Sequence, residues 1–374
     1  MLADLHRTWL IAGLALVVLL PPSALRADPL ELDLGGYIAA GVDRFGPFYN
    51  EEGDPDTTRG IVRNAKLELE MEWGSNWAAE IDGSYKARGN RGETELGDAY
   101  VQYQGANGFE AKLGRFKEPF GFERLTGYTN ISTSERSMVT SAFAPGRSQG
   151  LAIGQLNKAN TWFFGVFTKE PEGEETRAVT GRYTVAPVQN NRRTLHFGIA
   201  ASWRDLNGAR FQVKDRGEVF SADNILRSPR FEARHTTLGG LEAAWSSGRL
   251  TVVSEAMAQQ VERENGEHWR FSGAYLQVGF FLTNDHRRYK HGEFKGPDSP
   301  GPAGAVELVA RYSAVDLQDR DLGARAAIAL VGANYYLGNQ FQLRLNWLVP
   351  KVEGTILAPD PTGNAFTLRV LFRY

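Results

Sequence analysis

Basic side chains that could bind small anions gather in one long segment of the chain. Lys117, Arg124, Arg136 and Arg147 lie there among frequent Gly, Pro and Ser residues, and glutamates are interleaved with them. An arginine guanidinium presents a planar fork of N–H donors that fits phosphate, whereas a lysine ammonium acts as a point charge. The segment has no sustained helical period, and so long a connection inside a compact domain is usually functional. It is therefore the first candidate for an anion-binding site.

Catalytic and metal-binding chemistry has little support in the same sequence. The chain has no cysteine, which excludes disulfides, thiolate metal sites and a cysteine nucleophile. It contains neither the H-E-x-x-H pattern of zinc proteases nor a Gly-Lys-Ser/Thr phosphate loop. His196 is the one histidine in a predicted strand, and the spacing of His286 and His291 matches no metal motif. We therefore predict that the protein is not an enzyme and has no cofactor and no metal site.

The N-terminus predicts export from the cytoplasm. Arg7 precedes the apolar run Trp9–Leu20, and the small residues Ala24 and Ala27 follow. This order is typical of a secretory signal peptide, and the apolar run is too short to span a bilayer as a helix. We predict cleavage after Ala27, with Ala24 as the second choice and an uncleaved anchor as the alternative. The mature domain would then be residues 28–374, and its net charge, −2 for the whole chain, does not favour nucleic-acid binding.

Strict alternation of apolar and polar residues dominates the mature chain. In Ala65–Trp73 the apolar residues occupy every second position and alternate with Lys66, Glu68, Glu70 and Glu72. This period of two places one face of a strand in an apolar medium and the other in water. No other segment approaches 18 continuous apolar residues, so an α-helical membrane protein is excluded. The pattern predicts an all-β protein, a 16-stranded antiparallel transmembrane β-barrel.

The predicted strands alternate with connections of two lengths. The strands are Leu30–Val42, Ala65–Trp73, Trp77–Ala87, Thr94–Gln104, Phe109–Phe116, Gly150–Leu156, Thr161–Phe167, Ala178–Ala186, Thr194–Trp203, Thr236–Trp245, Arg249–Gln260, Phe271–Leu282, Ala305–Asp316, Ala324–Leu337, Gln340–Val349 and Ala365–Tyr374. Outer-membrane barrels have long outer loops and short periplasmic turns, and the connections follow this rule with one exception. The exception is Asn284–Gly304, which is long where a short turn is expected. The chain ends on an aromatic residue, as clients of the outer-membrane assembly machinery do.

Alternation also predicts which charged residues face the lumen. Lys86 and Arg88 share a face with other charged residues of their strand, and Lys112 lies opposite an apolar face. Arg115 formally follows the apolar face but lies at a strand end. The predicted pore residues, from strands and inward-folding segments together, are Lys86, Arg88, Asp98, Lys112, Arg115, Lys117, Arg124, Arg136, Arg147, Arg230, Arg234, Arg287, Arg288 and Lys290.

Several separate stretches resemble the phosphate-selective porin O and P family. The matching words include GRFKEPFGFERLT, ISTSERSMV, AFAPGRSQG, GDAYVQY, VTGRYTVAP, FEARHTT, VELVARYSAVDL and LVGANYYLGNQFQLRLNW, in order along most of the mature chain. The resemblance implies a 16-stranded, usually trimeric barrel of the bacterial outer membrane. It also implies that two outer loops and one periplasmic turn fold into the lumen. Here these would be Lys117–Gln149, Arg204–His235 and Asn284–Gly304.

The expected function is passive diffusion of small anions through a basic constriction, with phosphate or polyphosphate as the candidate anions. Expected partners are these anions, outer-membrane lipid and lipopolysaccharide, and further copies in a homotrimer. The alternative is a nonspecific or weakly cation-preferring porin, because Glu68, Glu70 and Glu72 on the predicted lumen face would repel phosphate.

Overall fold

The structure is a computed structural model that describes residues 30–374 except 55, 169–175, 298–299 and 355–361. The predicted signal peptide, residues 1–27, lies outside the described residues. Within the described part of the chain, helices are short, and none has the length and apolar character needed to cross a membrane.

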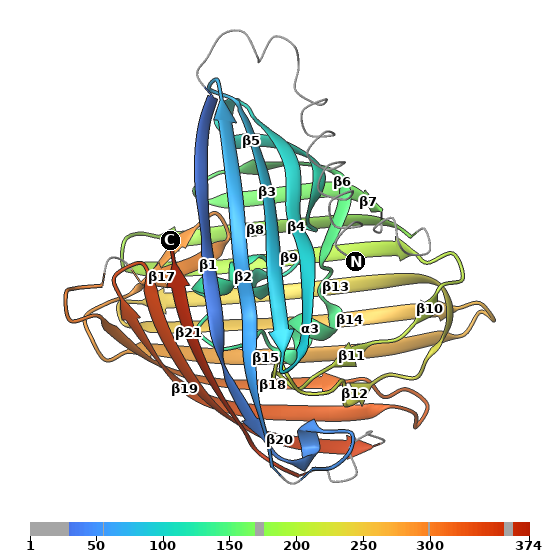
Figure 1. Ribbon diagram of the computed structural model, residues 1–374. Helices are drawn as coiled ribbons and strands as arrows, with labels where there is room; N and C mark the ends of the chain where they lie inside the picture. The colour runs from blue at the N-terminus through green and yellow to red at the C-terminus, as the bar shows by residue number, and fades with distance from the viewer. Residues whose placement is uncertain (1–29, 55, 169–175, 298–299, 355–361) are drawn as a thin grey trace.

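Sixteen long antiparallel strands form a closed barrel, as predicted (Figure 1). They are β1 (Leu30–Phe45), β2 (Thr57–Trp73), β3 (Trp77–Arg88), β4 (Arg91–Gln104), β5 (Phe109–Lys117), β6 (Arg147–Leu156), β7 (Asn160–Thr168), β8 (Arg177–Gln189), β9 (Arg193–Asp205), β13 (Phe231–Ser247), β14 (Leu250–Arg263), β15 (His268–Phe281), β18 (Ala305–Asp316), β19 (Ala324–Leu337), β20 (Phe341–Gly354) and β21 (Ala365–Arg373). Each pairs with the next, and β1 also pairs with β21 from Tyr37↔Arg373 to Phe45↔Ala365. This last pairing joins the first strand to the final one and closes the barrel.

Two strands begin much earlier than predicted, and in both cases a bulge interrupts the alternation. β2 begins at Thr57, and its register with β3 shifts between Val62 and Ala65. β13 begins at Phe231, and its register with β14 shifts between Ala233 and His235. An extra residue in one strand moves the following side chains to the opposite face, so a pattern of period two ends there.

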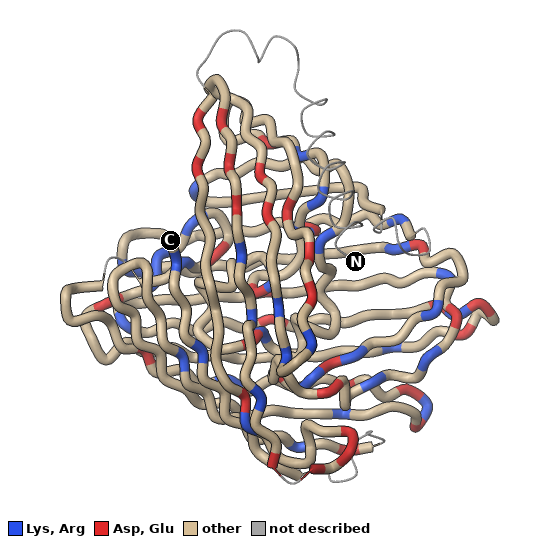
Figure 2. The backbone as a smooth tube through the Cα atoms, viewed as in Figure 1, with Lys and Arg blue, Asp and Glu red and all other residues tan. Residues whose placement is uncertain are grey.

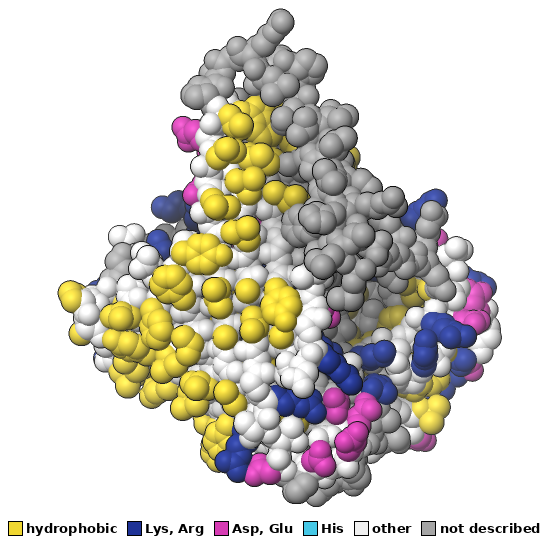
Figure 3. Space-filling model, in the orientation of Figure 1, with side chains coloured by type: hydrophobic (Ala, Val, Ile, Leu, Met, Phe, Trp, Pro, Cys, Tyr) yellow, Lys and Arg dark blue, Asp and Glu magenta, His cyan; other side chains and the backbone are white. Residues whose placement is uncertain are grey.

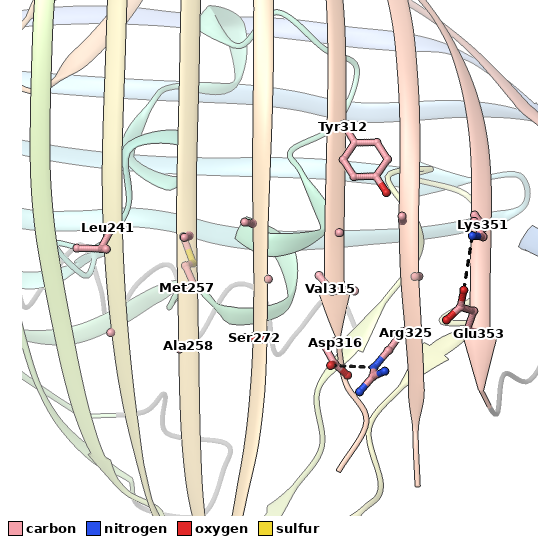
Figure 4. Close-up of a pocket in the computed structure, with 17 residues that line it drawn as sticks. Leu241, Met257, Ala258, Ser272, Tyr312, Val315, Asp316, Arg325, Lys351 and Glu353 are labelled. Atoms are coloured by element: carbon pink, nitrogen blue, oxygen red, sulfur yellow. Dashed lines mark hydrogen bonds and ion pairs between the residues drawn. The ribbon is translucent and has the colours of Figure 1, made fainter. Parts of the chain in front are cut away.

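The outer wall is apolar, as a membrane-facing surface must be (Figure 3). Leu67 is 53% exposed and Tyr312 is 57% exposed, although both are large hydrophobic residues in the middle of strands. Trp73 and Trp77 stack at the β2–β3 turn with their ring centroids 6.3 Å apart. On the opposite side, small side chains between Leu241 and Tyr312 leave a shallow groove of about 690 Å³, with the pairs Asp316–Arg325 and Lys351–Glu353 at one end (Figure 4).

Three connections fold into the barrel, and we name them by residue range. The first inner loop is residues 118–146 and contains α2 (Phe122–Leu125), η3 (Tyr128–Asn130) and α3 (Met138–Phe143). The second inner loop is residues 206–230, with β10 (Arg210–Phe211), β11 (Lys214–Asp215) and β12 (Leu226–Arg227). The inner turn is residues 282–304, with the hairpin β16 (Arg287–Lys290) and β17 (Glu293–Pro297). The long connection that broke the predicted parity is therefore a turn that enters the barrel.

The inner segments pack against each other as well as against the wall. Phe122 of the first inner loop meets Phe294 of the inner turn at 5.4 Å between ring centroids. The backbone N–H of Met138, at the start of α3, donates to Glu218 of the second inner loop at 3.0 Å. Ser137 caps this short helix by accepting from the Thr140 N–H at 3.2 Å. The first inner loop therefore lies between the other two segments and contacts both.

Candidate functional site: the charged lining of the barrel

All acidic side chains of the first inner loop pair with arginines of the barrel wall. Glu118 accepts from Arg204 of β9 at 2.6 Å and Glu123 accepts from Arg311 of β18 at 2.6 Å. Glu135 accepts from Arg63 of β2 at 2.8 Å. Strand alternation points these arginines inward, while the loop turns its carboxylates outward to meet them. The negative charge of the loop is therefore neutralised at the wall.

The basic side chains at and within this loop have a different kind of partner. Lys117 donates to the carbonyl oxygen of Leu125 at 3.2 Å, and the Arg124 guanidinium donates to the carbonyls of Thr140 and Ala144 at 2.7 and 3.0 Å. Arg136 donates to the carbonyls of Glu123 and Thr126 at 3.0 and 2.8 Å. Each of the three cations remains partly exposed. Carbonyl bonds orient a cationic head without cancelling its charge, so we name Lys117, Arg124 and Arg136 the basic triad.

Like charges converge at the basic triad. Arg136 and Arg147 are the cations that interact most strongly with both Lys117 and Arg124. Burial and then the like charge of Arg136 lower the pKa of Arg124 to about 9. Arg147, at the start of β6, is held at 2.6 Å from Asp98 of β4. The triad is therefore a concentrated positive site, and Arg147 is its neutralised neighbour.

Guanidinium groups and aromatic rings alternate beside the triad. Phe220, on the second inner loop, lies between Arg88 at 4.5 Å and Arg63 at 4.6 Å from its ring centroid. Tyr128, on the first inner loop, lies between Arg63 at 4.9 Å and Arg344 at 5.2 Å. Such cation–π contacts stabilise buried arginines without neutralising them. They also link the wall strands β2, β3 and β20 to both inner loops.

A carboxylate cluster faces the lumen from β2 and β3. Glu68, Glu80 and Asp82 bring oxygens close enough together to hold a cation. The ammonium of Lys66 already lies among them, 2.9 Å from Asp82 and 3.8 Å from Glu80, with Glu68 also in contact. A lysine in this position supplies the positive charge that a metal ion would otherwise supply. Figure 2 shows acidic residues concentrated on the part of β1–β4 next to the β2–β3 turn and basic residues farther along the same strands.

Other predicted pore residues on the strands have partners of their own. Lys86 contacts Glu95, and Arg88 lies 3.5 Å from Glu93. Lys112 lies 4.7 Å from the centre of the Tyr100 ring. Arg115 is buried and donates to the carbonyls of Leu96 and Gly97 at 3.2 and 3.0 Å. The φ of 133° at Gly114, which favours glycine, interrupts the alternation just before Arg115, so its position did not follow from the pattern.

The remaining predicted residues lie apart from the triad. Arg234 is exposed and pairs with Glu262 at 3.1 Å, and Arg230 is exposed beside a pocket of about 500 Å³ lined by residues of the loop ends. Arg287 is buried and pairs with Glu307 at 2.8 Å, where it anchors the inner turn. Arg288 and Lys290 are exposed on the same hairpin. Strand alternation could not predict that these residues lie apart from the triad, because all of them are in loops or at a bulge.

The pentapeptide Gly146-Arg147-Ser148-Gln149-Gly150 has the spacing of a hydrolase nucleophile elbow. A nucleophile elbow needs a sharp strand-to-helix turn and a histidine beside the serine. Ser148 instead lies within β6, and its hydroxyl donates to Glu118 at 2.7 Å. His196 is buried and contacts Tyr289 at 2.7 Å and Glu242 at 3.3 Å. Both groups are therefore parts of the packed lining.

Sequence reasoning missed the wall arginines that hold the inner segments. Arg63, Arg182, Arg204, Arg311, Arg344 and Arg369 were not singled out. A usable signal was present for Arg311, which alternates with the outward Tyr312 and must therefore point inward. Its partners could not be read from the pattern, because they lie on loops far away in the sequence.

Comparison with known proteins agrees with this architecture. Similar solved structures include an anion-selective porin from Comamonas acidovorans (TM-score 0.58, 15% identity, 92% of this chain and 100% of that chain covered). They also include the channel DcaP of Acinetobacter baumannii (TM-score 0.60, 11% identity, 92% and 97% covered). A third is OmpT of Vibrio cholerae in its trimer form (TM-score 0.57, 9% identity, 93% and 100% covered). At these identities the likeness shows the fold.

Sequence comparison is more specific about the family. Porin O of Pseudomonas aeruginosa is 23% identical, with 91% of this chain and 87% of that protein aligned. The sequence model described as "Phosphate-selective porin O and P" matches residues 32–374. The family and fold indicate a channel rather than an enzyme. The chain belongs to the phosphate-selective porin O and P family and is a β-barrel of the bacterial outer membrane.

Proposed function

We propose that the protein is an outer-membrane channel for passive diffusion of small anions, with the basic triad as its selective site. One observation carries the proposal. The carboxylates of the first inner loop are paired with wall arginines, whereas Lys117, Arg124 and Arg136 are held by backbone carbonyls. The loop therefore presents net positive charge to the lumen, although its sequence is nearly balanced. A charged constriction selects ions of the opposite sign.

Replacing the triad tests this function. We expect the Lys117→Gln, Arg124→Gln and Arg136→Gln triple variant to lose most of the chloride preference that the wild type shows in a KCl gradient across a planar bilayer. The Arg230→Gln and Arg234→Gln double variant, which removes two exposed cations away from the triad, is the matched control and keeps the preference. A triple variant with the wild-type reversal potential would refute the assignment.

Phosphate is the proposed physiological class of anion, with polyphosphate as a larger variant. Two of the three triad members are arginines, whose guanidinium forks match phosphate oxygens. The description of the family, phosphate-selective porin O and P, supports this choice. Added phosphate should reduce chloride conductance in the wild type and should do so much less in the triple variant. Equal block of both proteins would restrict the function to anions in general.

A nonspecific or weakly cation-preferring porin is the second candidate. The cluster of Glu68, Glu80 and Asp82 favours it, because one lysine balances three carboxylates there. A wild-type reversal potential of the cation-selective sign would establish this alternative. Replacing Glu68 and Glu80 with Gln should then move the potential toward the anion side.

We also propose that the protein forms a homotrimer whose outer wall contacts membrane lipid and lipopolysaccharide. The Vibrio cholerae OmpT structure described as a trimer form supports the first part. The exposed Leu30, Leu32 and Leu34, which extend past the end of β21, offer apolar surface to a neighbour. Native mass spectrometry of the detergent-extracted protein should give three copies, and a single copy would contradict the proposal.

A further inference from the structure

We infer that Arg311, which does not belong to the basic triad, determines the sign of the channel's selectivity by holding two loop carboxylates away from it. The inference rests on the proposed anion channel and names a specificity-determining residue on the opposite side of the first inner loop. The idea is electrostatic: the triad is effective only while the nearest acids are neutralised elsewhere.

Arg311 of β18 makes an extensive set of bonds inside the barrel. Its side chain is fully buried, and its guanidinium reaches Glu123 at 2.6 Å and Glu218 at 3.1 Å. The same group donates to the hydroxyl of Thr133 at 2.6 Å and to the carbonyl of Glu135 at 3.1 Å. Gln277 of the neighbouring strand accepts at 2.7 Å and completes the set. One wall arginine thus joins the first inner loop to the second.

Glu123 is an acid that lies beside two members of the triad, Arg124 and Arg136. It precedes Arg124, and its own carbonyl oxygen accepts from Arg136 at 3.0 Å. It is also the acid that interacts most strongly with both Arg124 and Arg136. Its two carboxylate oxygens point elsewhere, one to Arg311 and the other to the N–H and hydroxyl of Ser137 at 2.9 and 2.8 Å. Removing Arg311 leaves one of these two carboxylate oxygens without its cationic partner.

Glu218 reaches the same arginine from the second inner loop. It is 5% exposed and also accepts from the Ser313 hydroxyl at 2.6 Å and from the Met138 N–H at 3.0 Å. Two carboxylates therefore share one guanidinium, and the formal charge of the group is −1 with Arg311 and −2 without it. Removing the arginine from a buried ionic group leaves uncompensated charges, which must find a new cation or water. After Arg311, Arg136 of the triad is the cation that acts on Glu123.

The selectivity of three variants tests the inference. In Arg311→Gln, Glu123 is free to neutralise the triad, so the chloride-to-potassium permeability ratio should fall by at least about fourfold, the effect of one unit charge at ~5 Å in water. Adding Glu123→Gln and Glu218→Gln to this variant removes the freed charges and should restore the anion preference. Arg182→Gln is the control, because Arg182 is also buried in the wall and pairs with Glu242 at 2.8 Å.

The same measurements separate the possible failures. A wild type without anion preference refutes the proposed function, whereas an anion-selective wild type with an equally selective Arg311→Gln variant refutes only the role of Arg311. If Arg311→Gln only loosens the loops, adding Glu123→Gln and Glu218→Gln should not change the permeability ratio. That result would also overturn the inference. If Arg311→Gln does not fold, Glu123→Gln alone decides the question. Its ratio should match the wild type, since Glu123 is already neutralised, and a severalfold rise would show that Glu123 acts in the pore.

Discussion

The carboxyl group of Asp215 gives the second inner loop a dependence on pH. Asp215 is 5% exposed, and burial raises its pKa to about 8, although the Gly217 N–H donates to it at 2.6 Å. The ordinary value for aspartate is about 3.9. Between these two values the folded protein keeps the proton that the unfolded chain has lost. Stability therefore falls as the pH rises from about 4 to about 8.

Replacing Asp215 with Asn should remove this dependence. We expect Asp215→Asn to raise the unfolding temperature by a few degrees at pH 8, because the amide can still accept from Gly217 and needs no proton. At pH 4 both proteins carry a neutral group and should unfold together. Circular dichroism melts in detergent at the two pH values measure the difference. An equal gain at both values would show that the effect does not come from ionisation.

The inner turn is held in the barrel by a small aromatic contact as well as by Arg287. Phe294 of β17 is 3% exposed and packs against Phe122 and Tyr289. Truncating a buried phenylalanine to alanine costs ~3–5 kcal/mol. We expect Phe294→Ala to loosen the inner turn from the first inner loop while the strand pairings of the wall persist.

Single-channel recordings should detect this loosening. The Phe294→Ala variant should show larger current fluctuations and a changed mean conductance in KCl. Phe280→Ala removes a phenylalanine that is 36% exposed on the outer wall of the adjoining strand and should leave the recordings unchanged. If recordings from Phe294→Ala match those of the wild type, Arg287 and the backbone contacts alone are enough to fix the turn.

Strands were predictable from local pattern, and inner contacts were not. β3 was predicted as Trp77–Ala87 and observed as Trp77–Arg88. In a regular strand, the polarity of each residue indicates which face of the sheet its side chain occupies. The bulges near Val62 and Ala233 ended that correspondence and shortened two predicted strands. The pairing of Glu123 with Arg311 joins positions 188 apart, so no window of the sequence contains both partners. Which cations stay unpaired depends on such distant pairs, so the sequence named Lys117, Arg124 and Arg136 as candidates together with Arg147 but could not separate them from it.

For the molecule as a whole, the pairing of β1 with β21 is the contact that makes the sheet a barrel. Arg369 of β21 and Asp43 of β1 meet there at 2.6 Å, and both side chains are fully buried. Removing one partner of a buried ion pair costs ~3–5 kcal/mol because the other charge is left unpaired. We expect Arg369→Gln to lower the stability of the closed barrel by an amount in this range.

Urea unfolding, followed by the gel shift between folded and heat-denatured barrel, measures this loss. Arg325→Gln serves as the control, since Arg325 is 56% exposed on the outer wall and its pair with Asp316 should contribute less than ~1 kcal/mol. A variant at Arg369 no weaker than the control would indicate that Ser221, which donates to Asp43 at 2.8 Å, already satisfies that carboxylate.

The same pairing sets the order in which the molecule can be made. Arg369 also bonds to the Val42 carbonyl, 327 positions earlier in the chain, so closure requires the final strand. Contacts of such sequence separation form late and slowly. Until then the nascent sheet has two unpaired edges, which invite wrong partners and aggregation. A chain that stops before Ala365 is therefore expected to remain an open, aggregation-prone sheet rather than to form a narrower channel.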